Sequence, residues 1–223
     1  MNHLRLQDDV RAVAGALGSI PFDWDGRDSI TQMKEGGSSQ WRQMEWIGFY
    51  FEFLCQRHLS SILNMPGPSF GRVGFDAQRQ VPWDLKSHVT GPRKDTLIVN
   101  DTEAIHDAIQ KFGAVGLLVA SGIAIYDDER GSFRDWHDKL KGAESEYVKQ
   151  RKARGAKSRR RKVRFTIKEF LICGLDEDSL KTVGSFQRGM RNADGSPRRE
   201  KVSLNLRNLS REVLQTVRPG TTR

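Results

Sequence analysis

Two aspartates and a lysine in the segment 74–86 are the residues of this chain whose types and spacing best suit chemistry. Its sequence reads Gly-Phe-Asp-Ala-Gln-Arg-Gln-Val-Pro-Trp-Asp-Leu-Lys. In an extended strand, Asp84 and Lys86 lie two residues apart and therefore project from the same face. A tight connection centred on Gln80 places Asp76 directly across from Asp84, with about 4.5–5.5 Å between the opposed Cβ atoms.

Two carboxylates at that spacing can share one hard cation. Without a cation, like charges held opposite each other destabilise a hairpin. The positive partner is either Lys86 or a bound metal ion, and a site of oxygen acceptors without a thiol suits Mg²⁺ or Mn²⁺ better than Zn²⁺. The alternative is a surface hairpin in which an aspartate and a lysine form an ordinary salt bridge.

An unusually apolar helix is expected upstream, over residues 40–59, with Ser38 or Ser39 as its N-cap. Glu45 and Glu52 are seven residues apart and fall on one face of that helix. Burying a carboxylate among aromatic side chains is costly unless the carboxylate is paired or binds a metal. The alternative places both glutamates on a solvent-facing stripe together with polar neighbours.

Together these residues resemble the PD-(D/E)xK nuclease superfamily, in which a helix with a glutamate precedes a hairpin with one aspartate and then (D/E)-x-K. Glu52, Asp76 and Asp84-Leu85-Lys86 match that pattern in order. The stretch 46–52 (Trp-Ile-Gly-Phe-Tyr-Phe-Glu) is also similar to a helix of the mismatch-repair strand-nicking endonuclease and its restriction-enzyme relatives, which favours Glu52 over Glu45. The resemblance covers about residues 41–126.

This resemblance implies Mg²⁺-dependent hydrolysis of a DNA phosphodiester bond, with Mn²⁺ as a substitute. It assigns the metal to Asp76, Asp84 and the Leu85 carbonyl, and Lys86 to the attacking water and the developing charge. Glu52 would complete the ligand sphere or bind a second ion. The sequence departs from the pattern in having no proline before Asp76 and in having one two residues before Asp84.

The positive charge of the chain is concentrated in one run, residues 149–164, where ten of sixteen residues are lysine or arginine and none is acidic. Since the chain has 37 basic and 28 acidic residues, 27 basic residues remain outside the run and nearly balance the acidic ones. Such a block favours a polyanion such as DNA over a solvated loop. The expected phosphate contacts are Lys149, Arg151, Lys152, Arg154, Lys157, Arg159, Arg160, Arg161 and Lys162.

Three further features are weaker candidates. His88 lies two residues beyond Lys86, where it can reach a phosphate or simply end the strand. The glycine-punctuated segment 184–197 contains Arg188, Arg191 and Asn192, whose side-chain types read guanine and adenine edges in the major groove. An ordinary hairpin loop is the alternative for that segment. The sequence Asp-Trp-His-Asp at 135–138 is interpreted as helix surface.

The elements that must position these residues follow from periodicity and from turn-forming residues. Helices are expected at 4–17, 40–59, 102–112 and 133–150, and strands at 72–77, 81–89, 96–100, 114–126, 164–175 and 202–206, with loops at 19–37 and 64–71. Residues 114–126 are expected to form a strand buried on both faces. This order predicts an α/β protein whose restriction-endonuclease-like mixed central β-sheet is flanked by helices.

We expect one nuclease domain over residues 1–223, with a catalytic core at about 40–126 and a basic DNA-binding and specificity region at about 145–210. Cys55 and Cys173 lie in apolar runs and are interpreted as buried thiols in a reducing cytoplasm. The longest apolar stretch is too short to cross a bilayer, and the first nine residues do not resemble a signal peptide.

The leading functional hypothesis is a type II restriction endonuclease, part of a restriction-modification system, which cuts double-stranded DNA as a homodimer. A repair-type or structure-specific nickase of the same superfamily is the first alternative. A DNA-binding protein without catalysis is the second, and it is disfavoured because binding alone needs no paired carboxylates.

Overall fold

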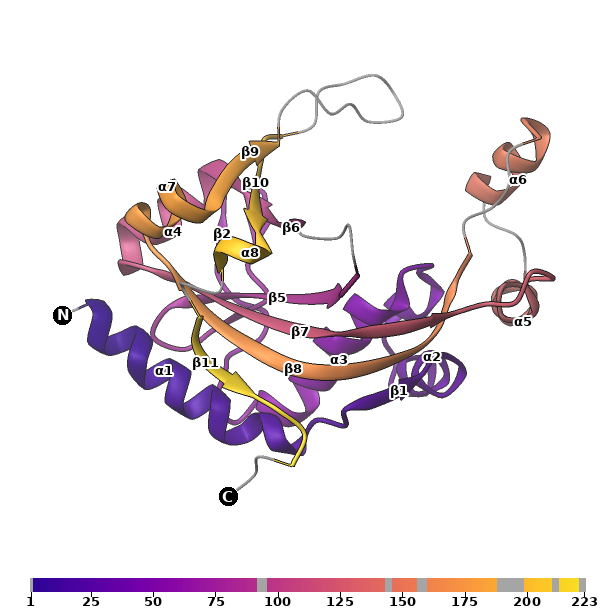
Figure 1. Ribbon diagram of the computed structural model, residues 1–223, viewed down its shortest axis with the longest axis horizontal. Coiled ribbons are helices and arrows are strands. Elements are labelled where there is room, and N and C mark those ends of the chain that lie inside the picture. Colours follow the sequence, from indigo (N-terminus) through magenta and orange to yellow (C-terminus); the bar gives the residue numbers. More distant parts are fainter. Residues whose placement is uncertain are drawn as a thin grey trace.

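The structure, a computed structural model, describes residues 2–91, 96–142, 146–155, 160–187, 199–209 and 213–220. Helices and strands are interspersed along the chain, with five consecutive strands between α3 and α4 (Figure 1). The helices are α1 (Asn2–Ala16), α2 (Gly26–Glu35), α3 (Trp46–Leu59), α4 (Thr102–Phe112), α5 (Ser132–Lys141), α6 (Glu146–Ala153), α7 (Glu177–Val183) and α8 (Leu206–Leu209), with 3₁₀ turns η1 (Leu17–Ser19) and η2 (Ser39–Arg42). The strands are β1 (Asp23–Asp25), β2 (Ser69–Phe70), β3 (Val73–Gly74), β4 (Ala77–Gln78), β5 (Pro82–Val89), β6 (Thr96–Asp101), β7 (Val115–Tyr126), β8 (Lys162–Leu175), β9 (Gly184–Gln187), β10 (Lys201–Asn205) and β11 (Val213–Val217).

The central sheet is mixed, as the sequence predicts for this α/β protein. Its strand order is β1-β8-β7-β5-β4, and β11 also pairs with β8. Strands β5 and β7 run parallel, whereas the other pairs in this sheet are antiparallel. A second sheet of order β6-β10-β9 and the short pair β2-β3 complete the described strands.

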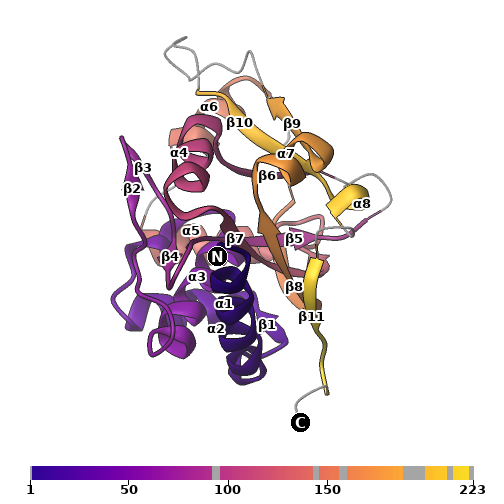
Figure 2. The ribbon, with the colours of Figure 1, turned by 90° about the vertical axis from the view of Figure 1, so that its left-hand side faces the viewer.

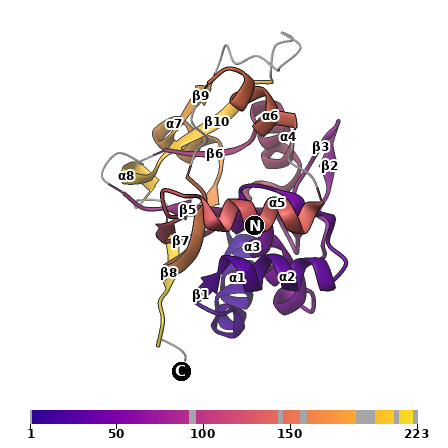
Figure 3. The ribbon, with the colours of Figure 1, turned by 90° about the vertical axis from the view of Figure 1, so that its right-hand side faces the viewer.

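Both faces of the central sheet are covered, each by a different set of helices and strands. Helices α1, α2 and α3 lie against one face, and α4, α7 and the small β6-β10-β9 sheet lie on the other (Figures 2 and 3). Two clusters of buried apolar residues follow this division. Along β7, Leu118 and Ala120 belong to the first cluster, while Leu117 and Val119 belong to the second.

This alternation confirms that β7 is buried on both faces over most of its length. Its last residues differ, because Ile123, Ile125 and Tyr126 extend beyond the covering layers and are exposed. The prediction that the whole stretch 114–126 is buried is therefore wrong at its C-terminal end. Both cysteines are buried, and neither is part of a disulfide bond. None of the described helices has the length and apolar character needed to span a membrane.

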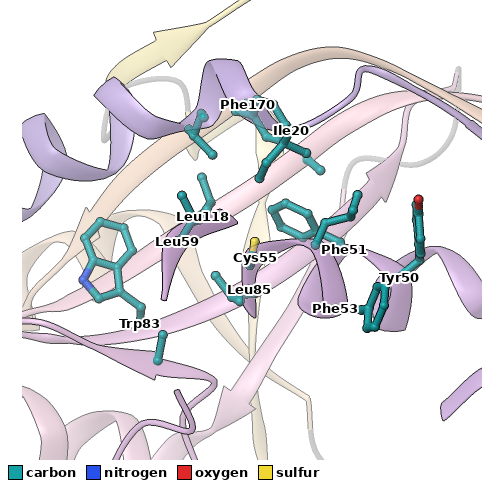
Figure 4. Close-up of a cluster of buried hydrophobic side chains, with 14 of the residues drawn as sticks. Ile20, Tyr50, Phe51, Phe53, Cys55, Leu59, Trp83, Leu85, Leu118 and Phe170 are labelled. Carbon is teal, nitrogen blue, oxygen red and sulfur yellow. The ribbon is translucent and has the colours of Figure 1, made fainter. Parts of the chain in front are cut away.

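Helix α3 packs its aromatic residues against the central sheet. Phe51 and Cys55 are fully buried and lie beside Leu85 of β5 and Leu118 of β7 (Figure 4). The helix begins at Trp46 rather than at residue 40, because residues 39–42 form a separate 3₁₀ turn. The Ser38 hydroxyl accepts a hydrogen bond from the Gln40 N–H and so caps that turn instead of α3.

Two other predictions about the elements are wrong. The expected loop 19–37 contains β1 and α2. Asp25 is the N-cap of α2, and its side chain accepts hydrogen bonds from the Arg27 and Asp28 N–H groups. Ile30 and Met33 of this helix are buried. The expected helix 133–150 is divided into α5 and α6. Gly142 ends α5 with a φ of 81°, a left-handed conformation that glycine adopts without strain.

Candidate active site

The β4–β5 hairpin has the register that the sequence predicts. Ala77 pairs with Trp83, and Gln78 pairs with Pro82. Continuing this register by one residue places Asp76 opposite Asp84, and the Asp76 N–H donates to the Trp83 carbonyl at 3.0 Å. The expected strand 72–77 is nevertheless interrupted, since β3 ends at residue 74 and β4 begins at residue 77.

Four groups of this hairpin converge on one point. The Asp76 Oδ2 atom accepts a hydrogen bond from the Leu85 N–H at 2.7 Å. The Lys86 Nζ atom lies 2.5 Å from Asp84 Oδ1, 3.3 Å from the Leu85 carbonyl oxygen and 3.9 Å from Asp76 Oδ2. The ammonium group is thus surrounded by three oxygens that come from both strands.

The electrostatics of this cluster are those of two carboxylates that share too little positive charge. Burial and the neighbouring Asp84 carboxylate raise the pKa of Asp76 to about 8. Burial alone would lower the pKa of Lys86, but attraction to Asp84 and Asp76 outweighs it, and the pKa is raised. Each group therefore keeps its proton more tightly than it would in water.

Glu52 approaches the cluster from α3. Burial raises the pKa of its carboxyl, and the nearby Asp84 charge adds to the increase while Lys86 opposes it. Glu52 lines two neighbouring cavities, one of about 620 Å³ and one of about 360 Å³. The smaller cavity is also lined by Asp76 and Leu85, and the larger one by His88. Glu52 thus stands where substrate can reach the hairpin.

The donor set fits a hard divalent cation at the hairpin itself. Asp84 is 4% exposed, and its Oδ2 atom is buried without a hydrogen-bond partner. An unsatisfied carboxylate oxygen beside a second carboxylate and a backbone carbonyl is a ligand set that suits Mg²⁺. Within the described ranges, no three histidine, cysteine, aspartate or glutamate side chains are clustered closely enough to hold a metal. Glu52 is therefore not brought to the two aspartates as a third carboxylate ligand.

Glu45 lies just outside α3 rather than within it, although it lines the larger cavity together with Glu52. It is the residue before the first turn of α3, with φ −91° and ψ 60°, and its side chain is mostly exposed. It forms an ion pair with Lys162 at the start of β8. His88 lies two residues after Lys86 on β5 and is partly buried.

The basic run is divided between a helix and a strand. Lys149, Arg151, Lys152 and Arg154 fall in α6 or just after it, and Lys149 and Arg154 are exposed. Lys157 and Arg159 lie outside the described residues. So do Arg188, Arg191 and Asn192 of the expected specificity segment.

The basic side chains at the C-terminal end of the run bond to oxygen atoms of the protein itself. The Arg160 guanidinium donates to the Asp127 carbonyl at 2.5 and 2.9 Å, and Lys162 pairs with Glu45. Arg161 is only 5% exposed, and burial lowers the pKa of its guanidinium. The Arg161 side chain therefore does not lie on the surface where a phosphate would contact it, contrary to the sequence-based expectation.

The segment 135–138 is not helix surface as expected, because His137 and Asp138 are both buried. The His137 Nε2–H donates to the Trp41 carbonyl at 2.9 Å. Burial lowers the pKa of His137 to about 4, so this imidazole is neutral near pH 7. The carboxylate of Asp138 pairs with Lys141 at 2.5 Å. Both residues anchor α5 rather than forming a site.

Asp9 is a site-shaping residue that sequence reasoning missed. It is fully buried, and its carboxylate accepts hydrogen bonds from the backbone N–H groups of Gln80 and Val81 and from the Trp83 indole, besides pairing with Arg79. These contacts fix the turn that sets the hairpin register. The signal was present, because Asp9 falls at the core-facing spacing of α1, three residues after one buried leucine and four before a buried valine.

The chain matches no protein-family model, no curated protein and no solved structure at a significant level.

Proposed function

We propose that this protein is a Mg²⁺-dependent endonuclease that hydrolyses phosphodiester bonds of double-stranded DNA, a member of the PD-(D/E)xK superfamily. The carrying observation is the hairpin in which Asp76, Asp84 and the Leu85 carbonyl converge with the Lys86 ammonium. A folded protein rarely holds a buried carboxylate such as Asp84 opposite a half-buried one such as Asp76 unless a cation belongs there. The order Glu52, Asp76, Asp84-x-Lys86 matches the superfamily's motif.

In this proposal each residue has a distinct role. Asp76, Asp84 and the Leu85 carbonyl hold the metal ion against the scissile phosphate. A bound Mg²⁺ supplies Lewis acidity and lowers the pKa of a coordinated water. Lys86 orients the attacking water and stabilises the negative charge that develops on the phosphoryl oxygens. Glu52, at the junction of the two cavities, binds a second ion or orients a water on the substrate side.

The distribution of positive charge supports a DNA substrate. Helix α6 projects from the end of the long β7–β8 pair that lies farthest from the small sheet (Figure 1). It presents Lys149 and Arg154 to solvent. Exposed cations of this kind contact phosphates without reading sequence, so they supply affinity and orientation rather than specificity.

The biological role we favour is a type II restriction endonuclease that acts as a homodimer and uses Mg²⁺ or Mn²⁺. A repair-type nickase with the same chemistry is the alternative. The resemblance of the stretch 46–52, at the start of α3, to the strand-nicking enzyme favours this alternative. A cytoplasmic location accords with two buried cysteines that form no disulfide bond.

Digestion of supercoiled plasmid with Mg²⁺ separates these roles. Discrete linear fragments support sequence-specific double-strand cleavage, and accumulation of open circles supports a nickase. Intact plasmid at every metal and protein concentration, together with normal DNA binding, would contradict the proposed catalysis and leave a DNA-binding protein.

A further inference from the structure

The Lys86 ammonium lies among the same oxygens that the proposed function assigns to the metal ion. Its three nearest carboxylate and carbonyl oxygens are Asp84 Oδ1 at 2.5 Å, the Leu85 carbonyl at 3.3 Å and Asp76 Oδ2 at 3.9 Å. The proposed function assigns the same three residues to the metal. A divalent ion binds oxygen ligands at about 2.0–2.6 Å. The lysine nitrogen already lies 2.5 Å from Asp84 Oδ1, so an ion bound to that oxygen competes with the ammonium for it.

We infer that Lys86 is the resident cation of the metal-free site, and that a divalent ion and the Lys86 ammonium occupy the carboxylate cluster alternately rather than together. This inference rests on the proposed function in that it adopts the same metal ligands. It adds that the Lys86 ammonium and the divalent ion compete for the same oxygens. This competition has two consequences for the protein before any DNA is cut.

The first consequence concerns the metal-free protein. Lys86 contacts Asp84 at 2.5 Å and lies 3.9 Å from Asp76, and attraction to both aspartates raises the pKa of the lysine. The second consequence concerns substrate. Once displaced from the cluster, the ammonium becomes available to a phosphate, so metal binding and phosphate binding by Lys86 are coupled.

The structure offers space for the displaced side chain. The cavity of about 360 Å³ beside the cluster is lined by Asp76, Leu85 and Glu52. Glu52 is the carboxylate there that already contributes to the raised pKa of Lys86. An ammonium that leaves Asp84 for this cavity would still have a negative neighbour in Glu52.

The competing arrangement leaves Lys86 in place. In it, a metal ion binds Asp84 through the unpartnered Oδ2 atom while Lys86 keeps its contact with Oδ1. Both arrangements predict tighter metal binding when the lysine charge is removed, so affinity alone does not separate them. The accessibility of the Lys86 amine does.

The deciding experiment is amine acetylation of the full-length protein with and without Mn²⁺, quantified for each lysine by mass spectrometry. If the ammonium leaves the carboxylates, Mn²⁺ should accelerate Lys86 acetylation several-fold, because the amine then no longer contacts the Asp84, Leu85 and Asp76 oxygens and becomes accessible to the reagent. Lys162, which pairs with Glu45 away from the cluster, is the internal control and should change little. Unchanged or slower acetylation of Lys86 in the metal-saturated protein would overturn the inference.

A second measurement uses Mn²⁺ titration calorimetry on Lys86→Met and on the matched control Lys162→Met. The Lys86 variant should bind Mn²⁺ at least about tenfold more tightly, because a unit charge at this distance is worth more than that even at an effective dielectric constant of about 20. Equal affinities in the wild-type protein and Lys86→Met would overturn the inference while leaving the proposed nuclease intact. Failure of both proteins to bind Mn²⁺ would overturn both proposals, whereas uncut plasmid with metal-induced exposure of Lys86 would contradict the nuclease alone.

Discussion

At the scale of single residues, the central feature is a buried pair of carboxylates with one lysine between them. Asp84 is nearly inaccessible and has an unpartnered oxygen, whereas Asp76 is fixed by the Leu85 N–H. Catalytic centres often hold groups whose protonation is strongly perturbed by burial and by like charges. Asp76 has this property, since burial and the Asp84 carboxylate raise its pKa to about 8. Glu45, which sequence spacing placed beside Glu52, is mostly exposed and pairs with Lys162.

The two glutamates of the α3 region should therefore behave differently. Glu52→Gln should slow plasmid cleavage about 10- to 100-fold, as expected for a group just outside the metal ligands. Glu45→Gln should change the rate less than about threefold, because an exposed ion pair contributes little. Steady-state rates with Mg²⁺ on the two variants make the comparison, and an equal decrease in both would contradict the placement of Glu52 at the site.

Because the pKa of Asp76 is raised in the folded protein, we expect the stability of the protein to depend on pH. This pKa is raised in the folded protein to about 8 from the ordinary 3.8, so folding favours the protonated form. That contribution is fully present below about pH 4 and disappears as the pH rises through about 8. The free energy of unfolding of the metal-free wild type, relative to that of Asp76→Asn, should therefore decrease over this interval.

Urea unfolding at several pH values measures this difference, and using the variant as reference removes the contributions of other groups. His137 is one such group, since its lowered pKa gives stability that disappears as the pH falls from about 6.5 to about 4. A constant difference between wild type and Asp76→Asn across the range would contradict the close approach of Asp76 to Asp84.

At the scale of elements, the sequence predicted the hairpin register because the short connection leaves few alternatives. It also predicted α1, α4, β6, β8 and β10 closely, since their apolar spacing is regular. It failed for α2, whose two buried apolar residues are separated by polar ones within a segment rich in glycine, aspartate and serine. It also extended α3 too far towards the N-terminus, because propensity does not show that residues 39–42 close a separate turn.

The contacts that fix the hairpin were beyond sequence reasoning, since they join α1 to a turn that is distant in the sequence. Asp9→Ala should lower the free energy of unfolding by about 3–5 kcal/mol, because it leaves the buried donors of the turn unpaired. Asp8→Ala is the matched control, and it should lower the free energy of unfolding much less, because Asp8 is exposed.

Chemical denaturation of the two variants tests this prediction. Similar stability in both would mean that Asp9 does not hold the turn. An Asp9→Asn variant that folds but cleaves slowly would show that the hairpin register, and not stability alone, depends on this carboxylate.

At the scale of the whole molecule, fewer residues of the basic run are available to contact DNA phosphates than the sequence predicts. Residues 160–164 belong largely to the protein's own contacts, with Arg160 on the Asp127 carbonyl, Arg161 buried and Arg164 paired with Asp23. The candidate phosphate contacts that remain in the described part of the run lie on and beside α6. The basic run therefore combines an anchored end with a solvent-facing helix.

Removing charge from α6 should weaken DNA binding uniformly across sequences. In the triple variant Lys149→Gln, Arg151→Gln, Lys152→Gln, the slope of log K against log salt should fall by about 0.9 for each phosphate that the protein no longer neutralises. Lys168→Gln on β8, an exposed lysine outside the run, is the control and should leave the slope nearly unchanged. Fluorescence anisotropy on one duplex over a series of salt concentrations measures both, and equal slopes in wild type and triple variant would exclude α6 from the DNA interface.

The most direct test of the account is the activity of Asp84→Asn and Lys86→Ala, measured side by side with DNA binding. Plasmid cleavage is followed with Mg²⁺, and duplex binding is followed with Ca²⁺. The account predicts that both variants fail to cleave while keeping DNA affinity, with Asp84→Asn slightly tighter in the absence of metal because a charge that repels phosphate is removed. Full cleavage activity in either variant would show that the hairpin is only structural and that catalysis lies elsewhere.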